Sequence, residues 1–182
     1  MKRSALRPGF SLIELMVTIA IIGFMMVLAL PSLGNSVRTS RERAVMQKFV
    51  QDFTWARGAA GAGDASALAA GLSGPPTLSL VLNADCSWST TISTTIAAGT
   101  LVTPDPVHSM ALADVTKQAS GIACTSAALG ATAALTYPIT FNFSSQGYVS
   151  ASGNVTATGA SSQVFKLNIL TSGSIIQGNS AS

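Results

Sequence analysis

Residues 10–30 read FSLIELMVTIAIIGFMMVLAL, a run in which Glu14 is the only charged side chain. Coiled as an α-helix with a rise of about 1.5 Å per residue, the run is roughly 30 Å long, which matches the hydrocarbon core of a bilayer. A cleavable signal peptide has a shorter apolar core, of about 7–15 residues. The run therefore favours a membrane-spanning helix over a cleavable signal.

Glu14 is an unusual residue in such a segment. Near the centre of a bilayer a carboxylate costs on the order of 2.5–3.5 kcal/mol even on the lenient insertion scales, so it needs a partner. The chain has no Lys or Arg from Ser11 to Val37, so its own helix supplies no counter-charge. We therefore expect the partner of Glu14 to come from another molecule or from a newly made chain terminus.

Residues 7–15, RPGFSLIEL, resemble the processing site of type IV prepilins and pseudopilins. In that family a short basic leader and a Gly precede Phe-[Ser/Thr]-Leu-Ile-Glu and a hydrophobic helix. The resemblance implies that residues 1–9 are a leader peptide, which a prepilin peptidase/N-methyltransferase removes between Gly9 and Phe10 before it methylates the Phe10 amine. It also implies that Glu14 faces the cationic N-terminus of a neighbouring subunit during filament assembly.

The membrane orientation also follows from the resemblance. Three basic residues precede the apolar run and four lie between Arg38 and Lys48, so the Lys/Arg bias does not choose a side. The family implies a single pass through the bacterial inner membrane by residues 10–31, with the N-terminus in the cytoplasm and a head domain in the periplasm. The implied partners are the other pilins or pseudopilins of the same filament.

Residues 32–62 follow Pro31, which falls where the family commonly has a helix-bending proline. Apolar residues recur here at spacings of three and four, which predicts one buried helical stripe: Val45, Phe49, Phe53, Ala56 and Ala60. The polar residues are expected on the other faces: Arg41, Glu42, Lys48, Gln51, Asp52 and Arg57. We expect one helix from about Phe10 to Ala60 that packs on its own head domain, and a linker at the glycine-containing stretch 58–63.

Residues 63–182 form the predicted head domain. From about Thr77 the chain is rich in Thr, Ser, Ala and Val with Gly and Pro between, which favours short strands. The predicted strands cover residues 78–82, 139–143 and 165–169, less clearly 88–96, with a turn at Gln146-Gly147. The fold class is therefore α+β, a long N-terminal helix packed on a C-terminal antiparallel β-sheet domain, as in pilins.

Two further segments resemble the GspH/FimT group of minor pseudopilins and pilins. Residues 51–60, QDFTWARGAA, are similar to its "d-x-x-x-A-R-x-x-A" segment, and residues 139–149, ITFNFSSQGYV, to its "i-x-F-x-x-x-G" strand and turn. In FimT-type members a Gly-Arg-x-Arg-like tail contributes to DNA binding. Here the corresponding residues, 173–176, read GSII, and beyond Gly58 two lysines stand against four aspartates. This departure speaks against nucleic acid as a partner.

The two cysteines, Cys86 and Cys124, both lie in the predicted head domain. In an exported protein the default is a disulfide, and closing this loop would stabilise the fold by about 4 kcal/mol in the chain-entropy model. The alternatives are two free buried thiols, or a metal site with His108. A single histidine and the absence of a Cys-x-x-Cys spacing argue against metal.

Catalysis is not expected. His108 is the only histidine, and after Pro104-Asp105-Pro106 it reads as part of a loop. A Ser-His-Asp arrangement is conceivable in a chain so rich in serine, but there is no Gly-x-Ser-x-Gly elbow, and solvated strand faces explain the serines better. We expect no cofactor and no metal.

The expected function is structural. The chain is interpreted as a minor pilin or pseudopilin that helps to initiate or cap a type II secretion pseudopilus or a type IV pilus. One alternative is a DNA-binding minor pilin for DNA uptake in natural transformation. Another is a major pilin that forms the bulk of a fibre.

Overall fold

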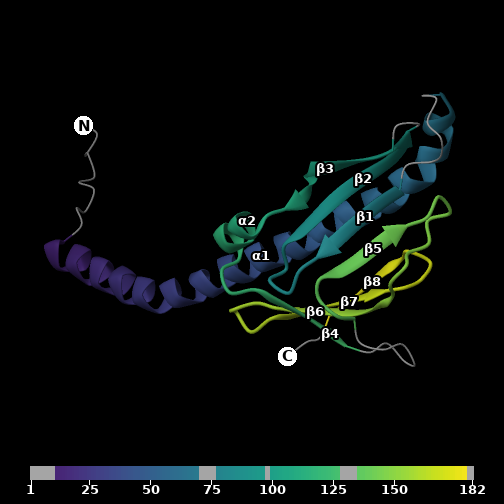
Figure 1. Cartoon of the computed structure of the whole chain (residues 1–182). Helices are drawn as coiled ribbons and strands as arrows, with labels where there is room; N and C mark the ends of the chain where they lie inside the picture. The colour runs from purple at the N-terminus through teal and green to yellow at the C-terminus, as the bar shows by residue number, and fades with distance from the viewer. Residues whose placement is uncertain (1–10, 70–76, 97–98, 128–134, 180–182) are drawn as a thin grey trace, which may run out of the picture. The chain divides into compact units, whose positions relative to one another are not determined.

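The computed structural model describes residues 11–69, 77–96, 99–127 and 135–179. The chain divides into two compact units, Met1–Val37 and Arg38–Ser182. Helix α1 (Leu12–Ala69) begins in the first unit, and the described part of the second adds helix α2 (Leu112–Gln118) and eight strands (Figure 1). All pairs of neighbouring strands are antiparallel, so the predicted α+β class is confirmed.

The strands form two sheets of four. The first has the order β3-β2-β1-β5, and the second has the order β4-β6-β7-β8. The strands of the first sheet are β1 (Thr77–Leu82), β2 (Trp88–Ile96), β3 (Gly99–Met110) and β5 (Ile139–Phe143). Those of the second are β4 (Ala123–Ala127), β6 (Gly153–Thr158), β7 (Val164–Ile169) and β8 (Ile175–Asn179). The four predicted strands are confirmed as β1, β2, β5 and β7.

The predicted turn between Phe143 and Tyr148 is also confirmed. The Gly147 N–H donates a hydrogen bond to the Ser144 carbonyl over 2.9 Å, which closes the turn. Gly147 has a φ of 79°, in the left-handed region that glycine adopts without a Cβ clash. The turn therefore requires its glycine.

The core lies between helix α1 and the strands. The predicted helical stripe is confirmed, because its members are at most 1% exposed: Val45, Phe49, Phe53, Ala56 and Ala60. The Phe53 ring packs edge-on against Phe141 and Phe143, with ring centroids 5.3 and 4.9 Å apart, and Phe49 packs edge-on against Trp88 at 5.4 Å. Aromatic pairs favour this geometry, and it fixes the helix in one register on the first sheet.

Helix α1 does not end at the predicted linker. It continues through the glycine-containing stretch 58–63 to Ala69. Alanine is the best helix former, and Ala56 and Ala60 are buried, so this packing offsets the cost of each glycine, about 1 kcal/mol. The predicted boundaries at residues 31 and 62 remain predictions.

The loop predicted around His108 is also wrong. Pro104, Pro106 and His108 all lie in β3, which is an outer strand of the first sheet. Only one side of an outer strand is hydrogen-bonded, so proline is accommodated there. The two prolines make this stretch of sequence resemble a loop.

Candidate assembly site

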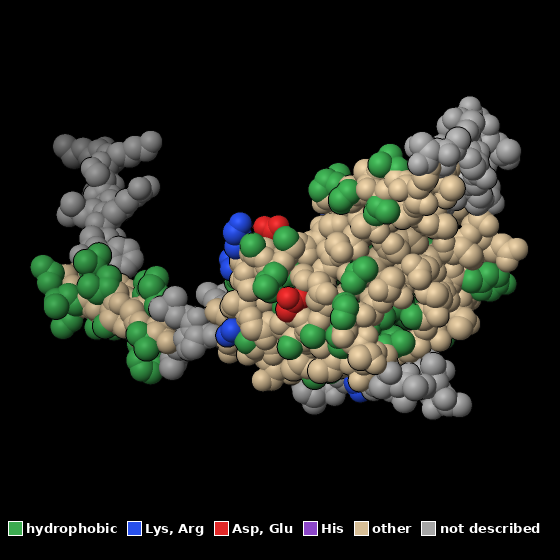
Figure 2. Space-filling model, viewed as in Figure 1, with side chains coloured by type: hydrophobic (Ala, Val, Ile, Leu, Met, Phe, Trp, Pro, Cys, Tyr) green, Lys and Arg blue, Asp and Glu red, His purple; other side chains and the backbone are tan. Residues whose placement is uncertain are grey.

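The first described part of α1 is apolar on all sides. From Leu12 to Val27 every residue is exposed within its unit, including Leu12 at 78% and Val27 at 69%. Figure 2 shows hydrophobic side chains along this segment. A helix that is apolar all round requires lipid or other protein around it. The segment therefore carries a surface for membrane or for assembly.

Glu14 lies in the first turn of this helix. The Ser11 hydroxyl oxygen accepts a hydrogen bond from the Glu14 N–H over 3.2 Å, so Ser11 caps the helix. The helix dipole favours a carboxylate at this end. Among the described residues, no side chain forms an ion pair with the Glu14 carboxylate. Gly9 and Phe10, the predicted cleavage and methylation residues, lie outside the described residues.

Pro31 lies within α1, at the position where a bend is expected. Its side chain is outside the described residues, and the bend remains a prediction. Across the residues that the structure describes, we find no helix with the length and apolarity needed to cross a membrane.

In the second half of α1, Glu42 was expected on a solvent face, and this expectation is wrong. Glu42 is fully buried. Ser161, in the turn between β6 and β7, donates its N–H to the carboxylate over 3.1 Å and also donates its hydroxyl. Gly159 makes room for the carboxylate, because an added Cβ would overlap it. The buried charge is tolerated because it is hydrogen-bonded, and it ties α1 to the second sheet.

Asp52 was also expected on a solvent face, but it is only 5% exposed. The Trp88 indole N–H donates to Asp52 Oδ2 over 2.8 Å, and Lys48 Nζ lies 2.7 Å from the same oxygen. Lys48 also donates to the Val107 carbonyl in β3 over 3.2 Å. Asp52 and Lys48 thus tie α1 to the first sheet.

Arg57 is half-buried rather than free on an outer face. Its side chain packs against Gly147 and Gly173, and added Cβ atoms there would come within 3.2 and 3.1 Å of Arg57 Nε. Arg57 Nη1 lies 3.5 Å from the Ser174 hydroxyl. The structure therefore brings together the helix segment 51–60 and the strand and turn at 139–149.

Residues 7–30 match the family model described as the prokaryotic N-terminal methylation motif. The chain carries a type IV prepilin-like leader. It fits a type IV pilin or pseudopilin, and proteins with this motif are generally structural subunits. The motif implies processing by a prepilin peptidase and assembly with other pilins. Comparison with curated proteins and with solved structures found no match.

The second unit holds its two cysteines together. The Cys86 and Cys124 sulfur atoms lie 2.02 Å apart and the Cα atoms 5.1 Å apart, within the range of disulfides. Cys86 lies between β1 and β2 of the first sheet and Cys124 in β4 of the second. The linkage therefore connects the two sheets of the second unit.

His108 packs against Trp55 of α1. Its ring stacks on Trp55 with centroids 3.4 Å apart, and its Nδ1 lies 2.7 Å from Asp105 Oδ2. Burial acts to raise the pKa of Asp105, but hydrogen bonds from His108 and Val107 outweigh it and hold that pKa below the ordinary value of 3.8. Across the described residues, no three His, Cys, Asp or Glu side chains are placed to hold a metal ion.

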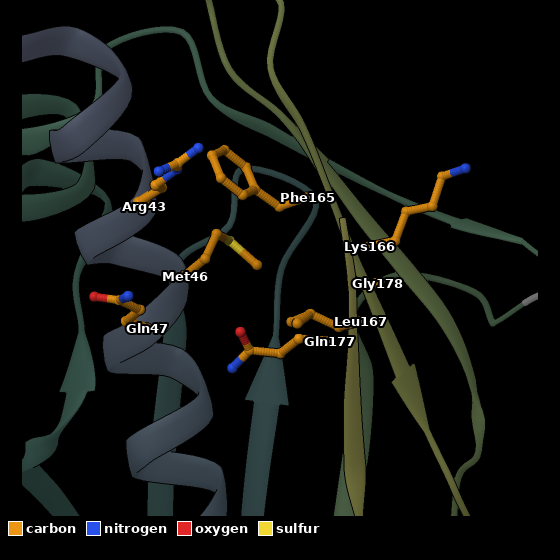
Figure 3. A pocket seen from close by; sticks show the side chains of 8 residues that line it. All are labelled: Arg43, Met46, Gln47, Phe165, Lys166, Leu167, Gln177 and Gly178. Carbon is orange, nitrogen blue, oxygen red and sulfur yellow. The ribbon is translucent and has the colours of Figure 1, made fainter. Parts of the chain in front are cut away.

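A hollow of about 310 Å³ lies between α1 and strands β7 and β8 (Figure 3). Met46, Phe165 and Leu167 give it an apolar wall, while Gln47 and Gln177 add amides. Lys166 points away from the hollow. The mixed lining identifies no particular ligand.

Proposed function

We propose that this chain is a minor pilin or pseudopilin of the GspH/FimT type. It is a non-catalytic subunit that helps to initiate or cap a type II secretion pseudopilus or a type IV pilus. The observation that carries the proposal is the N-terminal methylation motif at residues 7–30, whose Glu14 has no ion-pair partner among the described residues.

The proposed mechanism begins with cleavage between Gly9 and Phe10 and methylation of the Phe10 amine. Cleavage creates a cationic terminus at the start of the apolar helix, and this cation faces Glu14 of a neighbouring subunit. In a medium of low dielectric constant, a carboxylate beside a cation is far more stable than either group alone. The apolar side chains of the helix are stable both in lipid and in a filament. The charge pair forms only in the filament, and it therefore favours assembly.

The localisation follows from the same reasoning. Before assembly, residues 10–31 cross the inner membrane once, with the N-terminus in the cytoplasm. The head lies in the periplasm, an oxidising compartment in which a Cys86–Cys124 disulfide persists. After assembly the subunit belongs to the filament.

The assignment to the GspH/FimT group is supported by how its motif residues pack. Asp52, Ala56 and Ala60 lie on the buried face of α1, and Arg57 sits against the Gly147 turn. The resembling residues thus dock the helix on the head. This arrangement suits a structural subunit.

Replacement of Glu14 by alanine tests the proposal. We expect Glu14→Ala to remain in the membrane but to be lost from sheared or crosslinked filaments, because the Phe10 amine loses its partner. Thr18→Ala is the matched control: its hydroxyl bonds to the Leu15 carbonyl of the same helix over 2.8 Å, so its loss should leave assembly intact. Normal incorporation of Glu14→Ala would refute the pairing role.

DNA uptake is the rival function, and a gel shift separates the two. The residues 173–176 that correspond to the basic tail contain no arginine. We therefore expect no tight, salt-sensitive binding of duplex DNA by the chain from Arg38 onward. Such binding would favour the DNA-receptor function instead.

A further inference from the structure

We propose that Arg57 and the turn at residues 144–147 form a binding site for a carboxylate, and that this carboxylate belongs to a neighbouring subunit of the filament. The inference rests on the proposed function as a filament subunit. It adds an ion pair on the surface of the second unit to the one proposed for Glu14.

The Arg57 guanidinium has few partners among the described residues. An arginine carries five N–H donors and stays charged in proteins. Within the described ranges its hydrogen-bond partner is the Ser174 hydroxyl, at a long 3.5 Å, and no carboxylate there forms an ion pair with it. Arg57 is half-buried and has lost part of its hydration, so an acid from outside the chain would stabilise it.

The side chain of Arg57 is held in place by the turns around it. Gly147 and Gly173 lie against it, and an added Cβ at these positions would come within 3.2 and 3.1 Å of Arg57 Nε. The cation is therefore positioned before a partner arrives. Binding then costs less side-chain entropy than it would for a freely moving surface arginine.

A hollow of about 330 Å³ opens beside Arg57. Its other lining residues include five that are exposed, so the hollow faces solvent: Thr54, Gly58, Gly61, Ser145 and Gln146. None of the described residues that line it is acidic, so the cation meets no competing charge there.

Gly58 leaves the hollow open. It lies on the exposed side of α1, and an added Cβ would meet nothing within 4 Å. Glycine is a poor helix former, and the packing of the described residues does not require one here. An occupant of the hollow would require it, because a side chain at position 58 would narrow the space beside Arg57.

The charges of the chain favour a protein carboxylate over the phosphates of a nucleic acid. One guanidinium matches a planar carboxylate through two parallel N–H bonds. Beyond Gly58 the chain has two lysines against four aspartates, so it lacks the several cations with which a protein holds DNA. A single ion pair is sufficient between subunits of one filament, because the effective concentration of a tethered partner is high.

Titration of the full processed chain in detergent micelles with two small carboxylates tests the site. N-acetylaspartic acid α-amide carries the carboxylate of a side chain, and acetylglycine carries that of a chain end. The backbone amide NMR signals of Gln146 and Gly147 are followed at constant ionic strength. We expect saturable shifts with a dissociation constant of about 10–100 mM, the order of one charge-assisted pair. The tighter of the two ligands identifies the source of the carboxylate.

Three variants serve as the comparison. Arg57→Gln should weaken binding at least about fivefold, and Gly58→Leu, which keeps the cation but fills the hollow, should weaken it as well. Arg41→Gln removes an exposed cation from the same helix and should leave binding unchanged. A natural chain without saturable shifts, or equal binding by Arg57→Gln, would overturn the site. Tighter binding of inorganic phosphate than of either ligand would overturn the carboxylate as its occupant.

Filament incorporation tests where the carboxylate comes from. Arg57→Gln and Gly58→Leu should be processed and stay in the membrane, but they should enter filaments less than the natural chain and Arg41→Gln do. Normal incorporation of both variants would overturn the neighbouring subunit as the source. A natural chain that is itself absent from filaments would refute the proposed function. The titration does not depend on filaments, so the two failures are distinguishable.

Discussion

The fit between Glu42 and Gly159 gives the sharpest prediction for how the head holds its helix. Glu42 is fully buried, and its carboxylate occupies the space in which a side chain at position 159 would lie. Gly159 does not have a φ in the left-handed region, so alanine is compatible with its backbone. The cost of Gly159→Ala should therefore come from the overlap, and we expect about 1–3 kcal/mol, as for other overpacked sites.

Glu42→Ala should be costly for a different reason. It removes the acceptor of two hydrogen bonds from Ser161, and bonds to charged groups contribute about 1.5–3 kcal/mol each. Relief from burying the charge offsets part of this loss, so we expect a net cost of about 3 kcal/mol. In the double variant the new Cβ at position 159 enters the vacated space. The double variant should then be about as stable as Glu42→Ala alone, with a coupling of about 1–3 kcal/mol.

The two single variants and the double variant form a double-mutant cycle, and urea unfolding of residues 38–182 measures it. Tryptophan fluorescence reports the unfolding, because Trp55 of α1 stacks on His108 of β3 and Trp88 of β2 packs against Phe49 of α1. Gly58→Ala is the control: it is a helical glycine with open space around it, and the change should stabilise by up to about 1 kcal/mol. Strictly additive costs of the two substitutions, or a neutral Gly159→Ala, would refute the reasoning.

Three further predictions concern the same unit. Replacing Cys86 and Cys124 together by serine should destabilise it by up to about 4 kcal/mol under oxidising conditions, and intact mass after alkylation should find no free thiol in the natural chain; two alkylated thiols would contradict the linkage. Asp52→Ala should cost on the order of 2–3 kcal/mol in urea unfolding, because it leaves the buried Trp88 N–H without an acceptor, whereas Asp52→Asn should cost less; equal costs would argue against this bond. Asp105→Asn should destabilise at pH 7 but lose its effect as the pH falls below about 3.8, since a lowered pKa contributes stability only while the carboxylate is ionised; a pH-independent cost would contradict this.

Apolar periodicity was sufficient to predict much of the fold. The stripe through Phe49 and Phe53 and the alternation in β1 and β5 appear directly as buried positions, because large apolar side chains mark the inner face of each element. In β7, Leu167 and Ile169 are buried and Phe165 is half-buried. Strand β6 was not predicted. Its inner face is made of Gly153, Val155 and Ala157, which do not stand out in a chain rich in small residues.

The buried acids could not have been found from periodicity. A charged residue on a helix is normally solvated, so Glu42 and Asp52 were assigned to outer faces. Their partners are remote in sequence, with Ser161 119 positions from Glu42 and Trp88 36 positions from Asp52. Only the folded chain brings these groups together. In contrast, the methylation motif at residues 7–30 could be recognised because its residues are contiguous in the sequence.

The mature N-terminus tests the central claim most directly. Intact and peptide mass spectrometry of the protein purified from its native membranes should find a chain that begins at Phe10 and carries one additional methyl group on the Phe10 amine. Gly9→Trp should block this cleavage and serves as the unprocessed standard. A natural chain that keeps residues 1–9, or that begins at another residue, would contradict the assignment to a processed pilin-like subunit.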